Sequence, residues 1–191
     1  MYICLLNCSS GQFDSFINNF KEISLPFTIK GETFDRNSVR EDLYVISEED
    51  FVKYLMMEGD TFINVKGSAP IGYHKYTEVG KFDVYDDFLG VLYFRTIDGE
   101  DGSKILELML CVFTKKGELI SAYPISGFYT AENITFDSTI FSAENIEISI
   151  YKFETHEDRF GTFYLRSENV IEKKNLYITK DGLIQQRQNN I

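Results

Sequence analysis

The expected sheet is built on the segment Lys104-Ile-Leu-Glu-Leu-Met-Leu-Cys-Val-Phe-Thr114. Apart from Glu107, its interior is apolar at odd and at even positions alike. Because successive side chains of a strand point to opposite faces, a strand with this pattern has to bury both faces. The sequence therefore predicts a central strand over 104–114, in which Cys111 is a buried small apolar residue.

Other segments alternate apolar and polar side chains, which is typical of antiparallel strands with one face on a core. Ile134, Phe136 and Ile140 are separated by polar neighbours, and residues 146–150 repeat the pattern. This alternation, in which every second residue is apolar, begins near Thr61 and continues toward the end of the chain. It predicts roughly eight to ten strands, arranged as a meander, a curled sheet or a sandwich.

Glycines mark the turns between these strands. Residues 114–118 read Thr-Lys-Lys-Gly-Glu and residues 179–183 read Thr-Lys-Asp-Gly-Leu. Each segment places a glycine where a short hairpin loop needs a positive φ. Residues 98–102, Asp-Gly-Glu-Asp-Gly, predict a longer hairpin tip.

The first of two predicted helices covers residues 12–22. Its apolar residues recur at the spacing of one helical face, and Pro26 follows the segment as a stop. The residues on that face are Phe13, Phe16, Ile17 and Phe20. An extended connection is expected over 27–42.

The second predicted helix covers residues 48–57. Ser47 precedes it as a capping residue, with Asp50 in the third position, and Gly59 follows as the stop. The expected fold class is α+β, mainly β, with the two N-terminal helices packed on a large antiparallel sheet. Residues 12–191 are expected to form a single globular domain.

Composition narrows the range of functions. The chain has 191 residues with 30 Asp and Glu against 19 Lys and Arg, a net charge of −11. Binding to nucleic acid depends on clustered basic residues, and so does adsorption to anionic lipid. The sequence therefore predicts no nucleic-acid partner, and contact with a membrane only through a lipid anchor.

The residues that usually carry chemistry are sparse. Three cysteines and two histidines, His74 and His156, show no zinc-ligand spacing, and no disulfide framework is expected. The chain contains no nucleophile elbow, phosphate loop or dinucleotide fingerprint. We expect no cofactor and no metal. A hydrolase would have to use dispersed carboxylates such as Asp86, Asp87, Glu144 and Glu147.

Aromatic residues supply the candidate binding site. The chain holds 17 Phe and 12 Tyr but no Trp. Five tyrosines, together with Phe128, are candidates to line a groove for a sugar or a peptide. They are Tyr73, Tyr76, Tyr85, Tyr123 and Tyr129. The alternative is that these aromatics pair across strands and fill the core.

The N-terminus carries a possible processing signal. Residues 5–8, Leu-Leu-Asn-Cys, resemble a bacterial lipobox, in which a Leu lies three positions before the lipid-modified cysteine. Cys8 is thus a candidate for lipid attachment, and residues 1–11 for a signal-peptide remnant and tether. Asn7 stands where lipoboxes have a small residue, and no basic segment precedes. Two interpretations stay open, a start codon that is assigned too late and an ordinary N-terminus.

The layout resembles uncharacterised lipoprotein-like proteins of the Bacteroidetes. The resemblance rests on residues 5–11, on Ile23-Ser-Leu-Pro-Phe27 and on Tyr177-Ile-Thr-Lys-Asp-Gly182. It implies an anchored envelope protein and supplies no activity and no site residues.

Three hypotheses follow for the function. The first is a non-catalytic binding or scaffold module of the cell envelope, with a protein or small-molecule partner. The second is a cytoplasmic acidic interaction protein of the inhibitor or immunity type, because complementary charge speeds association with a basic partner. The third is the hydrolase with dispersed carboxylates.

Overall fold

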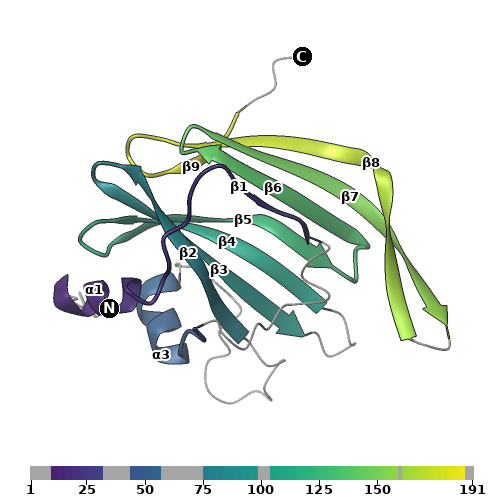
Figure 1. The fold of residues 1–191 in the computed structure, drawn as a ribbon, viewed down its shortest axis with the longest axis horizontal. Coiled ribbons are helices and arrows are strands. Elements are labelled where there is room, and N and C mark those ends of the chain that lie inside the picture. The colour runs from purple at the N-terminus through teal and green to yellow at the C-terminus, as the bar shows by residue number, and fades with distance from the viewer. Residues whose placement is uncertain (1–9, 32–43, 57–74, 99–103, 159–160, 188–191) are drawn as a thin grey trace, which may run out of the picture.

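The structure is a computed structural model of the chain, and it describes residues 10–31, 44–56, 75–98, 104–158 and 161–187. The described residues are mainly β (Figure 1). The helical elements are α1 (Ser10–Ile17), α3 (Glu48–Asp50) and the π-helical turn η2 (Phe51–Leu55). The strands are β1 (Phe27–Ile29), β2 (Lys75–Tyr85), β3 (Phe88–Asp98), β4 (Lys104–Thr114), β5 (Leu119–Tyr129), β6 (Ile134–Ser142), β7 (Asn145–Asp158), β8 (Gly161–Ile178) and β9 (Ile184–Gln186).

The strands form one antiparallel sheet in which β2 to β9 follow one another in chain order. This confirms the prediction of a mainly β chain built on a large antiparallel meander. Strand β1 is the exception, because it pairs with β6, where Phe27 lies opposite Ile140. Residues 27–29 are extended, as expected for a connection over 27–42, but their pairing with β6 was not predicted. A strand of three residues is too short to show a period of two.

Strand β4 has the predicted bounds and lies between β3 and β5. One of its faces joins a first core and the other joins a second core. The first face consists of Leu106, Leu108, Leu110 and Val112. The second face presents Met109, Cys111 and Phe113. The prediction of a strand buried on both faces, with Cys111 inside it, is confirmed.

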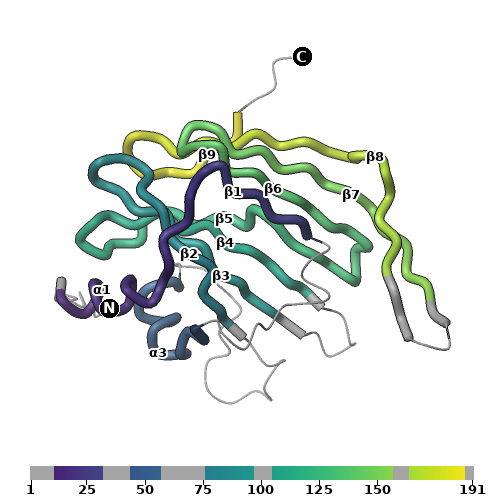
Figure 2. The backbone as a smooth tube through the Cα atoms, viewed as in Figure 1, coloured from purple at the N-terminus to yellow at the C-terminus, as the bar shows by residue number. Residues whose placement is uncertain are grey.

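The sheet curls until strands that are distant in its order touch. The Tyr85 hydroxyl on β2 donates to the Ile178 carbonyl on β8 at 3.0 Å. The Ser121 hydroxyl on β5 donates to the carbonyl of Gly182, before β9, at 2.7 Å. The first core therefore collects apolar side chains from β2 to β8 into one cluster. Strands β7 and β8 continue past the end of β6 as a two-stranded ribbon (Figure 2).

The second core joins the N-terminal segments to β2, β3 and β4. The ring centroids of Phe13 on α1 and Phe113 on β4 lie 5.3 Å apart. The Phe51 ring stacks on the Tyr76 ring with a centroid distance of 3.8 Å. Both helical segments are shorter than predicted. Helix α1 ends at Ile17, and a single turn continues the chain to Phe20.

The second helical segment begins as predicted and ends early. The Ser47 side chain accepts from the Asp50 amide at 3.0 Å, which confirms the cap. After Asp50 the chain makes a π turn that closes with a bond from the Met56 amide to the Phe51 carbonyl. Residue 57, Gly59 and the region near Thr61 lie outside the described residues.

The two predicted glycine turns have the same geometry. Gly117 has φ 93° and Gly182 has φ 81°, which is the left-handed region that favours glycine. In each turn the threonine amide donates to the carbonyl four residues on, from Thr114 to Glu118 and from Thr179 to Leu183. Both hairpin predictions are confirmed. Asp98 ends β3 opposite Lys104, and the rest of the predicted 98–102 tip lies outside the described residues.

Truncation of a β4 side chain tests the two-faced burial of that strand. Leu110→Ala removes a fully buried side chain, and we expect a loss of about 2–5 kcal/mol in the free energy of unfolding. Leu165→Ala is the matched control, because Leu165 is 53% exposed on β8, and its loss should stay below about 1 kcal/mol. Urea denaturation measures both values. Equal losses for the two variants would contradict the central position of β4.

Candidate functional site

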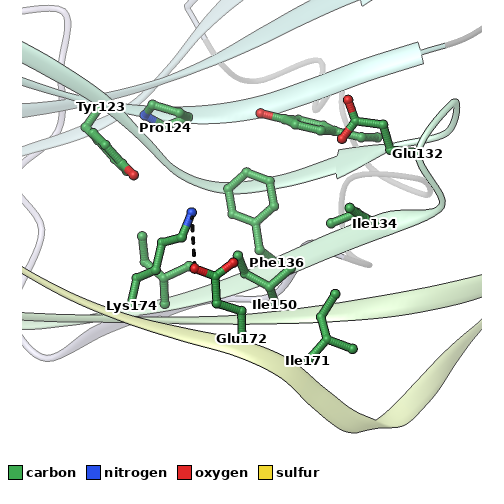
Figure 3. A pocket seen from close by; sticks show the side chains of 11 residues that line it. Tyr123, Pro124, Glu132, Ile134, Phe136, Ile150, Ile171, Glu172 and Lys174 are labelled. Atoms are coloured by element: carbon green, nitrogen blue, oxygen red, sulfur yellow. Dashed lines mark ion pairs between the residues drawn. The ribbon is translucent and has the colours of Figure 1, made fainter. Parts of the chain in front are cut away.

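A pocket of about 270 Å³ lies between β5 and the layer formed by β6, β7 and β8 (Figure 3). Its lining is mostly apolar, with two tyrosines and three charged residues. The lining residues are Tyr123, Pro124, Tyr129, Glu132, Ile134, Phe136, Ile148, Ile150, Ile171, Glu172 and Lys174.

The pocket exists because β5 separates from β6. Strand β5 pairs with β6 only over Gly127–Tyr129. Strand β7, in contrast, pairs with β6 along nearly the whole length of β6. A register shift interrupts the β4–β5 pairing next to Pro124, whose nitrogen has no hydrogen to donate. Beyond this point β5 no longer follows β6, and space opens between Tyr123 on β5 and Lys174 on β8.

Gly127 allows the central ring of the pocket to take its place. A Cβ atom at Gly127 would lie 2.7 Å from the ring of Phe136 and 2.8 Å from the Leu106 carbonyl oxygen. Only a residue without Cβ therefore lets Phe136 lie against the β5 backbone. Phe136 in turn meets the Tyr129 ring edge to face, with centroids 5.3 Å apart. Figure 3 shows Phe136 in the middle of the lining residues.

Tyr129 is fixed by a buried charge network. Its hydroxyl donates to Glu107 on β4, and the second oxygen of Glu107 accepts from the Arg95 Nε on β3 at 2.7 Å. Glu107 and Arg95 are both buried, at 6% and 8% exposed. Glu107, the one polar residue in the interior of the apolar strand β4, is thus the acceptor that holds Tyr129 in the wall of the pocket.

Burial and the adjacent Glu107 carboxylate raise the pKa of Tyr129 far above its ordinary value of 10.0. The folded protein therefore keeps the phenol proton at a pH where the unfolded chain releases it. The corresponding stability is fully present below pH 10 and is lost as the pH rises above it.

The Tyr129→Phe variant tests this linkage. It lacks the phenol proton, so its free energy of unfolding should fall less between pH 9 and pH 11 than that of the wild type. At neutral pH the variant should be less stable by about 1–3 kcal/mol, because one Glu107 oxygen loses its donor. Urea denaturation across this pH range measures both effects. Parallel pH profiles for the two proteins would contradict the network.

The structure separates the five tyrosines of the predicted groove. Tyr123 and Tyr129 come together in the pocket. Tyr76 is buried in the second core, and Tyr85 is half-buried with its hydroxyl bonded to the β8 backbone. Tyr73 lies outside the described residues. Phe128, adjacent to Tyr129, is buried and stacks on the Phe153 ring at 4.5 Å.

Sequence reasoning missed the other half of the pocket. Phe136, Ile148 and Ile150 belong to the alternating pattern of β6 and β7, which was assigned to the core. The pattern is correct, since Phe136 and Ile148 are buried, but the divergence of β5 leaves a pocket beside this face. The sequence around Glu172 and Lys174 does not indicate a binding site, because charged residues at alternate positions are common on exposed strands.

The remaining predicted residues lie apart from the pocket. Asp86 and Asp87 form the β2–β3 turn, and Glu144 lies in the β6–β7 turn. His156 on β7 lies 3.6 Å from a Glu154 oxygen. Cys8 and His74 lie outside the described residues. Among the residues that the structure describes, no group of three or more His, Cys, Asp and Glu could hold a metal ion, and no helix is long and apolar enough to cross a membrane.

Comparisons of the chain with protein-family models, with curated proteins and with solved structures gave no match. The resemblance to lipoprotein-like proteins therefore stays a prediction.

Proposed function

We propose that this chain is a non-catalytic binding module that holds a small, mainly apolar ligand between β5 and the β6–β8 layer. One observation carries the proposal, namely an apolar pocket with a few polar groups at its edge. Ligand sites in proteins typically have this composition. In this arrangement the N-terminal helical segments serve as the cover of the opposite face of β2–β4.

The size of the pocket limits the ligand. Its 270 Å³ is close to the lower end, about 300 Å³, of typical ligand pockets. At ~30 Å³ for each water molecule, this volume equals about nine waters, so a ligand of roughly ten non-hydrogen atoms fits. Most lining residues lie on strands, and Tyr129 is held by Glu107, which supports a site that is formed before the ligand arrives.

A substitution at the rim tests the pocket without disturbing the core. Ile171 lines the pocket but is 49% exposed, so Ile171→Trp can fill the opening while the fold is kept. Screening small aromatic and aliphatic compounds by amide chemical shifts should give ligands that perturb β5, β6 and β7. We expect Ile171→Trp to weaken their binding by about tenfold or more, since the indole occupies their space.

The matched control is Leu183→Trp, which adds the same side chain at a 43% exposed position outside the lining. It should leave binding within about twofold of the wild type. The proposal fails if no compound shifts residues of the lining, or if both tryptophan variants weaken binding equally.

We also propose that the module is anchored in the cell envelope through Cys8. The support is the pattern of residues 5–8 alone. Expression in a bacterium with labelled palmitate should label the wild type and not Cys8→Ala, while Cys4→Ala stays labelled. Absence of label from the wild type would remove the anchor and leave the binding module without it.

A further inference from the structure

We propose that the ligand of this pocket is a small amphipathic amine, with a protonated nitrogen near Glu132 and an apolar body against Phe136, Ile148 and Ile150. This inference rests on the proposed function and adds the chemical class of the ligand. The two are separable, because a pocket can bind apolar compounds without any preference for charge.

The charges of the lining favour a cation. Glu132, Glu172 and Lys174 carry a formal sum of −1. The Lys174 Nζ lies 3.8 Å from the Glu172 Oε1, and the opposite charges of this ion pair largely cancel. Figure 3 shows this pair at one side of the pocket and Glu132 at the other, beyond Phe136. The charge that is left for a ligand is therefore that of Glu132, in the β5–β6 turn.

The aromatic side chains act in the same direction. The faces of Tyr and Phe rings attract cations, and Tyr123, Tyr129 and Phe136 all line the pocket. The phenol proton of Tyr129 is already donated to Glu107, so this hydroxyl offers a ligand lone pairs and no hydrogen. Burial and then Glu107 raise the pKa of Tyr129, Arg95 lowers it, and Glu132 makes the smallest contribution, which raises it. Glu132 and Tyr129 both line the pocket, so a ligand in it is exposed to the carboxylate and to the ring.

A carboxylate ligand at Lys174 is the competing arrangement. It would have to displace Glu172 from Lys174 and would lie close to a second carboxylate. An anion would also approach a chain of net charge −11, whereas a cation is attracted to it. Both effects oppose an acid and favour an amine of the same shape.

Three compounds with one body and different head groups test the proposal. They are 3-phenylpropylamine, 3-phenylpropan-1-ol and 3-phenylpropionate, each with roughly ten non-hydrogen atoms, the size that the volume admits. Titration calorimetry and amide chemical shifts at pH 7 and low salt give their dissociation constants. We expect the amine to bind about fivefold tighter than the alcohol, and the alcohol tighter than the acid.

Glu132→Gln removes the charge and keeps the shape of the side chain. In this variant the amine should bind within about twofold of the alcohol, while the affinity of the alcohol itself is unchanged. Glu118→Gln, an exposed change in the β4–β5 turn outside the lining, is the matched control and should keep the fivefold preference. Both positions are exposed, so both variants are expected to fold.

The outcomes separate the two proposals. If none of the three compounds binds the lining, the proposed function itself fails. If the alcohol binds and the amine has no advantage, or if the acid binds best, the pocket stands and the amine proposal is overturned. It is also overturned if Glu132→Gln and Glu118→Gln lower the preference for the amine equally.

Discussion

Strand β4 is buried on both of its faces, and this double burial constrains how the other elements are arranged. An apolar strand of this kind needs a layer of protein above and below it, and a single flat sheet supplies neither. The curled strands β6 to β8 cover the face of Leu108 and Leu110, and the second core covers the face of Cys111 and Phe113. Two separate cores thus share one strand, and removing water from both sides of it is the dominant favourable term.

The curl creates the pocket. In the part of the chain that the structure describes, the sheet stays open, with no pairing between its two end strands, and β5 separates from β6, where pairing is reduced to three residues. Gly127 leaves room for the Phe136 ring, and β1 pairs with the part of β6 that β5 leaves free. The pocket is therefore a product of the same geometry that encloses the first core.

The sequence was sufficient for the elements whose burial repeats regularly. Strand β4 could be predicted to the residue because both of its faces are apolar, and the turns at Gly117 and Gly182 because only glycine accepts their φ. The pocket could not be predicted, because Phe136 and Ile150 follow the same alternation as fully covered core residues. Tyr76 and Tyr123 also carry no distinguishing pattern in the sequence. The N-terminal segments bury Tyr76 in the second core, whereas Tyr123 lines the pocket.

The pairing of β1 with β6 bears on how the protein is made. Thr28 meets Thr139, so the two partners are 111 residues apart in the chain. At the usual rate of synthesis, about 5–20 residues per second, the ribosome needs roughly 6–22 s to make β6 after it has made β1. During that interval β1 has no strand to join. The N-terminal segment is thus synthesised early but can take its place in the sheet only after more than half of the chain has emerged.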